Sequence, residues 1–124
     1  MSFENRHIIV TGGGTGVGRA MAEAFAHAGA KVTIMGRREA PLREVATQHK
    51  FIGWVCCDVT DPEAVRAAFG QARDLNGPVS VVVANAGAAE SVPFHRMTPE
   101  QLQSMLAVNL GGVVNVWHMA NFCR

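Results

Sequence analysis

The sequence contains no tyrosine, and it has only two lysines, Lys31 and Lys50, among 124 residues. Cysteine is also scarce: Cys56, Cys57 and Cys123 form no C-x-x-C motif, and no histidine stands at a spacing typical of zinc ligation. We therefore expect no metal site. We expect the cysteines to be buried, reduced thiols, as is usual in a reducing compartment.

The sequence also lacks a large excess of charge of either sign. The net charge is +1, and no basic stripe or charge block runs along the chain, which argues against a nucleic-acid or membrane-surface role. Before its first glycines the chain has only a short apolar run, HIIV, which is too short for a secretory segment or a membrane span. These features predict a cytoplasmic protein whose partners are small molecules or other subunits.

Apolar residues make up 48% of the chain, enough for the core of a single domain spanning residues 1–124. Strand-like apolar runs alternate with segments of helical periodicity. The predicted strands cover residues 7–10, 31–35, 51–55 with the two following cysteines, and 79–84. The predicted helices cover residues 16–28, a segment from residue 39, residues 62 to about 76, and a segment from residue 99.

Residues that start or stop helices support these boundaries. Gly29 stands where a left-handed C-terminal cap belongs, and Thr60 or Asp61 is positioned to cap the third helix. Thr98 is a good N-cap for the fourth helix, followed by a proline at its first position. Leu102, Met105, Leu106, Leu110 and Val113 then form one apolar face of that helix.

Strands such as VSVVVA are apolar on both faces, which is typical of a parallel sheet covered by helices on each side. Because crossovers between parallel strands are right-handed, the alternation predicts an α/β, doubly wound parallel sheet of Rossmann type. We predict four strands in the order 3-2-1-4.

The stretch TGGGTGVGRA follows the first predicted strand. It lacks the lysine of an ATP-type phosphate loop and does not fit G-x-G-x-x-G in any register. It does fit T-G-x-x-x-G-x-G through Thr11, Gly12, Gly16 and Gly18. Glycines at such a turn let backbone N–H groups and the positive end of the helix dipole approach a pyrophosphate.

This spacing resembles the short-chain dehydrogenase/reductase family, and three later motifs extend the resemblance over the whole chain. They are Asp58-Val59 after the third strand, Asn85-Ala86-Gly87 after the fourth, and Val108-Asn109 in the fourth helix. The resemblance implies that Asn109 belongs to the catalytic site. The cofactor-binding residues that we predict are Gly12, Gly14, Thr15, Gly16, Val17, Gly18, Arg37, Arg38, Asp58, Val59, Asn85, Ala86, Gly87 and Val108.

The end of the second strand indicates which dinucleotide is preferred. An acidic residue there usually grips a free ribose 2′-hydroxyl, whereas a 2′-phosphate requires positive charge. Here Gly36 occupies the strand end and Arg37 and Arg38 follow, which favours NADP(H). The alternative is that both arginines begin a solvated helix in an NAD-binding protein.

The resemblance also shows what this chain lacks. In that family a tyrosine exchanges a proton with a carbonyl or alcohol substrate, assisted by a lysine four residues later and by a serine. No tyrosine is present, and both lysines lie far upstream of that position. We interpret the chain as a truncated fold, the N-terminal, cofactor-binding half of an oxidoreductase about twice as long, inactive by itself.

Two other interpretations remain: a non-catalytic dinucleotide-binding or partner-associating module, and a product without a stable fold. The family is commonly oligomeric through its fourth and fifth long helices, so we expect a homo-oligomer. Ser91 to His95 are candidates for the rim of the substrate pocket, with His95 expected in a surface loop rather than in catalysis.

Overall fold

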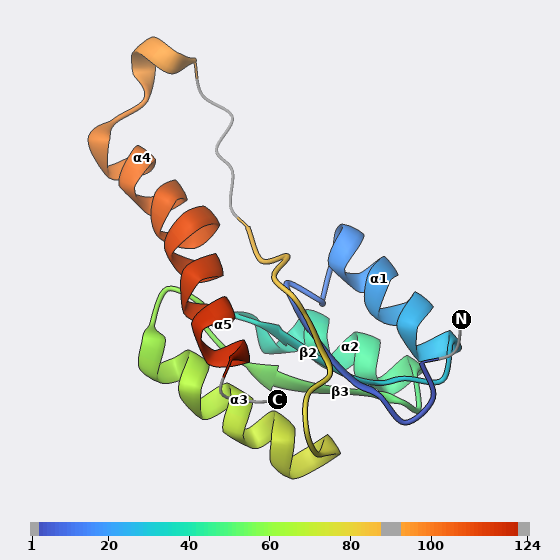
Figure 1. Cartoon of the computed structure of the whole chain (residues 1–124). Helices are drawn as coiled ribbons and strands as arrows, with labels where there is room; N and C mark the ends of the chain where they lie inside the picture. The colour runs from blue at the N-terminus through green and yellow to red at the C-terminus, as the bar shows by residue number, and fades with distance from the viewer. Residues whose placement is uncertain (1–2, 88–92, 122–124) are drawn as a thin grey trace.

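The computed structural model describes residues 3–87 and 93–121. Its centre is a four-stranded parallel sheet in the order β3-β2-β1-β4 (Figure 1), which confirms the predicted topology. The strands are β1 (His7–Thr11), β2 (Lys31–Gly36), β3 (Ile52–Cys56) and β4 (Val81–Val83). The helices that precede β4 are α1 (Gly16–His27), α2 (Glu39–Gln48) and α3 (Pro62–Asn76).

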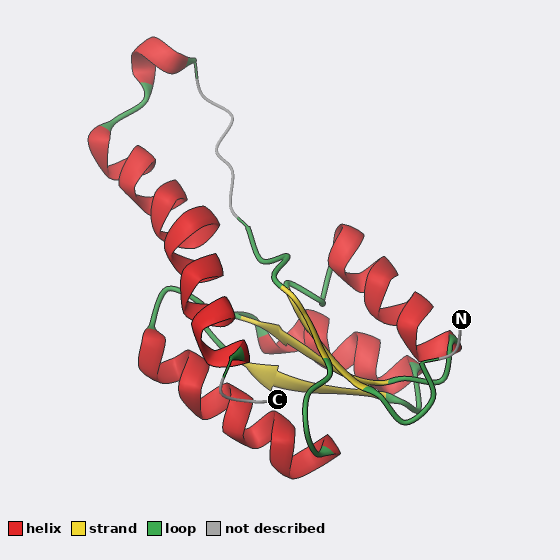
Figure 2. Ribbon diagram, in the orientation of Figure 1, coloured by secondary structure: helices red, strands yellow, loops and turns green. Residues whose placement is uncertain are grey.

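Two hydrophobic clusters fill the two faces of the sheet. Because successive strand residues point to opposite faces, Ile8 and Val10 of β1 enter one cluster and Ile9 enters the other. The first cluster includes apolar residues of α1 and α2, and the second includes residues of α3 and Val116. Helices therefore cover both faces (Figure 2), as expected for strands without a polar side.

Local signals in the sequence explain several helix ends. Asp61 caps α3 by accepting hydrogen bonds from the backbone N–H groups of Glu63 and Ala64, at 3.0 and 3.4 Å. Thr98 forms a capping box with Gln101 at the next α-helix, α4 (Pro99–Leu106). Gly29 has φ +95°, the left-handed conformation that glycine adopts most readily.

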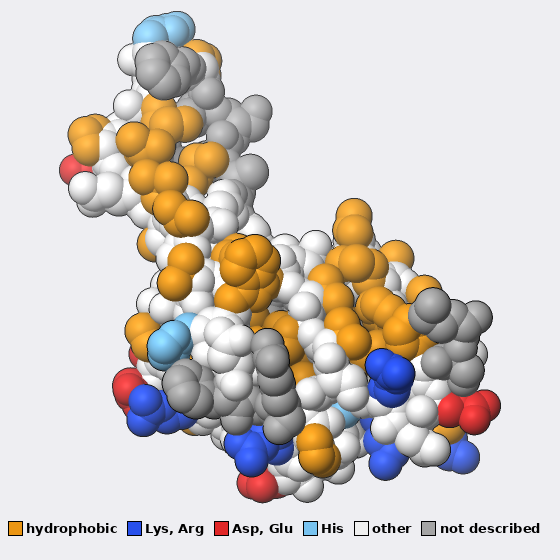
Figure 3. Space-filling model, in the orientation of Figure 1, with side chains coloured by type: hydrophobic (Ala, Val, Ile, Leu, Met, Phe, Trp, Pro, Cys, Tyr) orange, Lys and Arg blue, Asp and Glu red, His pale blue; other side chains and the backbone are white. Residues whose placement is uncertain are grey.

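A long helix, which begins with α4, follows the short 3-10 turn η1 (Phe94–Arg96) and departs from regular α-helical geometry. After α4 it continues through a π-helical segment, η2 (Ala107–Gly112), into α5 (Val113–Ala120). Its apolar face is largely exposed: Leu102, Leu106 and Leu110 are 48%, 50% and 61% exposed. Figure 3 shows hydrophobic side chains gathered along this helix, where it projects from the body of the molecule.

Two other details differ from the sequence predictions. β4 comprises three residues, fewer than the predicted residues 79–84. The prediction that the cysteines are buried is correct for Cys57 but wrong for Cys56, which is exposed; both thiols are free. Alternation explains this difference, because Cys56 ends an edge strand and faces away from the core that Val55 and Cys57 enter. Cys123 lies outside the described residues.

Among residues 3–87 and 93–121, no helix combines the length and the hydropathy required to cross a membrane.

Candidate dinucleotide site

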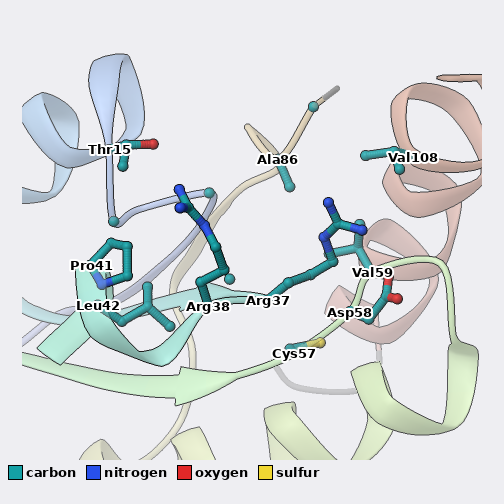
Figure 4. Close-up of a pocket in the computed structure, with 14 residues that line it drawn as sticks. Thr15, Arg37, Arg38, Pro41, Leu42, Cys57, Asp58, Val59, Ala86 and Val108 are labelled. Atoms are coloured by element: carbon teal, nitrogen blue, oxygen red, sulfur yellow. The ribbon is translucent and has the colours of Figure 1, made fainter. Parts of the chain in front are cut away.

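A cleft of about 180 Å³ opens at the carboxyl ends of the strands. It lies where β1, β2, β3 and β4 lead into their following loops, the place where doubly wound folds bind ligands. Figure 4 shows side chains from these loops converging on it, with Val108 entering from the long helix. The lining residues are Gly12, Gly14, Thr15, Gly36, Arg37, Arg38, Pro41, Leu42, Cys57, Asp58, Val59, Ala86, Gly87 and Val108.

The glycine-rich turn forms one wall of the cleft and leads into α1. Gly12 and Gly16 have φ values of +67° and +57°, which few other residues adopt. Gly18 is required for a different reason: a Cβ at this position would lie 2.1 Å from the carbonyl oxygen of Gly12. The turn can therefore fold this tightly only with glycine at these positions.

Thr11 ties the glycine-rich turn to the loop after β4. Its hydroxyl oxygen accepts hydrogen bonds from the backbone N–H groups of Asn85 and Ala86, both at 3.0 Å. The side-chain amide of Asn85 donates to the carbonyl of Gly12 at 3.4 Å. The N-A-G motif thus holds the turn from behind, and Ala86 and Gly87 face the cleft.

Arg37 and Arg38 supply positive charge on the second wall. Both are exposed, and Figure 4 shows them diverging: Arg38 extends toward Thr15, whereas Arg37 extends toward Asp58 and Val59. Gly36 ends β2 and lines the cleft, and because it has no side chain, it leaves the cleft open to the two arginines that follow. This part of the cleft is consequently suited to an anion.

Asp58 supplies the carboxylate of the third wall. The backbone N–H and the hydroxyl of Thr60 both donate to its Oδ1 atom, at 3.0 and 2.7 Å. These bonds, and to a lesser degree the charge of Arg37, lower the pKa of Asp58. Burial raises the pKa of the neighbouring Cys57 thiol to about 11, so this thiol is an unreactive part of the wall.

The long helix closes the cleft on the remaining side. Val108 lines it, and Asn109 lies close by, because a Cβ at Gly87 would stand 3.1 Å from the Asn109 Oδ1 atom. Both residues belong to the π-helical segment η2, a type of distortion that is frequent at functional sites.

Most of the residues that the sequence singled out meet at this cleft. The predicted residues that do not line it are Gly16, Val17, Gly18, Asn85 and Asn109. The first four belong to or support the glycine-rich turn, where Val17 is 70% exposed, and Asn109 lies next to Gly87. Sequence reasoning missed Pro41, Leu42 and Cys57 and did not count Gly36 as a site residue. The signal for Cys57 was its place directly before Asp58 at a strand end. His95 is exposed in η1, and Ser91 lies outside the described residues.

Within the described ranges, no group of three or more histidine, cysteine, aspartate or glutamate side chains could hold a metal ion. The charged side chains that line the cleft are those of Arg37, Arg38 and Asp58.

Comparison with known proteins extends this description. Residues 6–121 match the family model described as short chain dehydrogenase. D-erythrulose reductase of Gallus gallus is 38% identical over 116 residues, which are 94% of this chain and 46% of that protein. The 3-oxoacyl-[acyl-carrier-protein] reductase MabA of Mycobacterium tuberculosis is 38% identical over 120 residues, 96% of this chain and 45% of that protein.

Among solved structures, a short-chain type dehydrogenase/reductase from Mycobacterium marinum superposes with a TM-score of 0.94 at 28% identity. The match covers 98% of this chain and 51% of the other. The chain thus spans about half the length of the relatives that it matches.

Proposed function

The chain belongs to the short-chain dehydrogenase family, whose members use NAD or NADP with small carbonyl or alcohol substrates, and we propose that it is the NADP(H)-binding part of such an oxidoreductase. In this proposal residues 1–124 form a single dinucleotide-binding domain. The bound cofactor supplies hydride to a carbonyl, or takes it from an alcohol.

The observation that carries the proposal is the convergence of the glycine-rich turn, the two arginines and Asp58 on one cleft. The N–H groups at the start of α1 and the positive helix end hold the pyrophosphate. Asp58 and Val59 border the adenine. The cleft is smaller than the ~300–1,000 Å³ of typical ligand pockets, so it would hold only the adenosine end of the dinucleotide, and Gly87 and Asn109 would border the remainder.

Preference for NADP(H) rests on charge at the end of β2. A carboxylate at position 36 would repel a 2′-phosphate, and glycine stands there. Arg37 can donate charge-assisted hydrogen bonds to the 2′-phosphate and stack on the adenine. Arg38, from the same loop, extends toward Thr15 and adds a second positive charge. The chain's own residues thereby bind and orient the dinucleotide.

A titration tests the cofactor assignment. Replacing Arg37→Ala should weaken NADPH binding by about 1.5–3 kcal/mol, the scale of a hydrogen bond between charged groups, and should leave NADH binding unchanged. Arg43→Ala is the matched control, because Arg43 is an exposed arginine of α2 outside the cleft, paired with Glu39. An equal loss of binding free energy for NADPH and NADH would contradict a contact between Arg37 and the 2′-phosphate.

In the family that the chain resembles, a tyrosine exchanges the proton with the substrate, and this sequence contains no tyrosine. We propose that the isolated chain binds the dinucleotide without turnover, since no tyrosine is available to exchange a proton with the substrate. D-erythrulose and L-xylulose are suitable test substrates, because similar proteins from Gallus gallus and Bos taurus are named as reductases of these sugars. Substrate-dependent oxidation of NADPH by the purified chain would contradict this part of the proposal.

A second candidate function is a non-catalytic module that binds the dinucleotide and associates with a partner. The absent tyrosine favours it. Saturable NADPH binding without turnover fits both candidates, and association with a partner distinguishes the second. We further propose a homo-oligomer, supported by the exposed apolar side chains of the long helix, and a cytoplasmic location, supported by the free thiols of Cys56 and Cys57.

A further inference from the structure

We propose that Asn115 is a positioning residue that holds the Asp58-Val59 segment in place at the adenosine end of the cleft. The inference rests on the proposed function, because it concerns the same binding site. Asn115 lies on α5, outside the cleft lining, and none of the sequence motifs includes it.

The contact is direct. The side-chain amide of Asn115 donates a hydrogen bond of 2.8 Å to the backbone carbonyl of Val59. One turn earlier, Gly112 brings the helix backbone against the same residue, since a Cβ at Gly112 would lie 2.5 Å from Cγ2 of Val59. Close packing and a hydrogen bond thus fix Val59 against the long helix.

The position of Asn115 in its helix indicates a specific role. Val108, Gly112, Val116 and Met119 follow one helix face, and the three with apolar side chains pack in or against the core cluster that contains Val59. Asn115 is partly buried beside this face, where an amide costs desolvation unless it is paired. The Val59 carbonyl provides that partner.

The other ties of the segment lie on either side of Val59. The Cys57 N–H donates to the Gly36 carbonyl at 2.8 Å, and the Asp61 N–H donates to the Asp58 carbonyl at 3.1 Å. Between them, the Val59 carbonyl accepts from the Asn115 amide, and the N–H of the same peptide unit, that of Thr60, donates to Asp58 Oδ1. Losing the Asn115 bond removes the tie on the carbonyl side of this peptide and leaves the Thr60 N–H bond to Asp58 on the other side. The peptide plane is then held less firmly, and so are the Asp58 and Val59 side chains that line the cleft.

Binding of two ligands of different size distinguishes a local effect of Asn115 on the adenosine end of the cleft from a general loss of stability. ADP carries adenine and pyrophosphate, whereas inorganic pyrophosphate probes the glycine-rich turn alone. Asn115→Asp is nearly isosteric but cannot donate when ionised, and Asn115→Ala removes the group. Both variants should raise the Kd of ADP roughly fivefold to tenfold, the scale of one lost hydrogen bond, and change that of pyrophosphate by less than about twofold.

Asn76→Ala is the matched control. Asn76 also donates one amide hydrogen bond, to the Thr33 hydroxyl at 3.1 Å, but neither residue lines the cleft. This control should lower the melting temperature while leaving the Kd values of both ligands within about twofold of the wild type.

Three results would overturn the inference. One is wild-type affinity for ADP in both Asn115 variants. Another is an equal loss of ADP and pyrophosphate binding, which would reveal a general structural role. If the wild-type chain itself binds neither ADP nor NADPH, the proposed function fails and the inference with it, an outcome distinguishable from a failure of the variants alone.

Discussion

Gly18 illustrates at the scale of a single residue why the turn needs glycine. Its N–Cα–C backbone passes so close to Gly12 that a Cβ would overlap the Gly12 carbonyl oxygen and the Asn85 amide. The close approach keeps the start of α1 against the turn. Only a shift of the backbone could make room for a side chain, because the first obstacle is a main-chain atom.

Replacing Gly18→Ala should therefore lower the free energy of unfolding by about 1–3 kcal/mol, the usual cost of overpacking, and weaken NADPH binding. Gly70→Ala is the matched control: Gly70 lies within α3 with no atom near its would-be Cβ. Alanine there should raise stability by about 0.5–1 kcal/mol. Chemical denaturation measures both, and a stable, tightly binding Gly18 variant would contradict the close-approach argument.

His7 is a second residue with a defined role, at the start of β1. It is 1% exposed. Its Nδ1 atom faces the Gly77 carbonyl at 2.9 Å and must donate, so Nε2 accepts from the Thr33 hydroxyl at 2.7 Å. That hydroxyl accepts from Asn76. A second proton on the ring would require the Thr33 hydroxyl to rotate away and accept from Nε2 instead of donating to it.

Burial, and to a lesser degree the charge of Lys31, lower the pKa of His7 below its usual 6.5. The unfolded chain therefore binds a proton at His7 more readily than the folded chain does. The contribution of neutral His7 to the free energy of unfolding is complete above about pH 6.5 and is lost as the pH falls toward the lowered pKa of the folded state. The melting temperature should therefore decrease between about pH 8 and about pH 5, and His7→Leu should make this decrease smaller.

The exposed His95 provides the control for that series. His95→Asn should leave the slope of stability against pH unchanged. If His7→Leu keeps the full wild-type slope, groups other than His7 determine the acid sensitivity.

At the scale of elements, the long helix of α4, η2 and α5 carries the most exposed apolar surface among the described residues. We call Leu102, Leu106, Leu110, Val114 and Trp117 the apolar stripe; each is 48% to 61% exposed. The first four recur at every fourth position, the pattern of a helix face that packs on a partner. An exposed stripe of this kind indicates an association surface.

Leu106→Glu with Leu110→Glu should therefore convert the proposed homo-oligomer to monomers, since carboxylates at the centre of the stripe would have to be desolvated. Leu75→Glu is the control, because Leu75 is 62% exposed on α3, outside the stripe. Sedimentation velocity distinguishes the species. A wild-type chain that sediments as a monomer would contradict the proposed homo-oligomer.

At the scale of the whole molecule, the sequence predicted the strand order because its local patterns agree with one another. Apolar runs such as VSVVVA, glycine turns and N-caps such as Asp61 all depend on nearby residues. The strand order and the Asp61 cap appear as predicted, although only Val81–Val83 of VSVVVA form the strand. The cleft was predictable in outline because the carboxyl ends of parallel strands meet at one edge.

Features that depend on distant residues were not predictable. The bond from Asn115 to Val59 joins two elements far apart in the sequence. The exposure of Cys56 depends on the position of β3 at the edge of the sheet. The π-helical segment η2 likewise follows from no local composition, since Ala107 to Gly112 give no signal that distinguishes it from α-helix.

The central claim is that the cleft at the carboxyl ends of the strands holds a dinucleotide. Amide NMR spectra of the wild-type chain, recorded during titration with NADP⁺, test it most directly. The account predicts saturable shifts at Gly12, Thr15, Arg37 and Asp58, with His7 unaffected at the far end of β1. Unchanged spectra, or shifts confined to the end of the sheet where His7 lies, would contradict it.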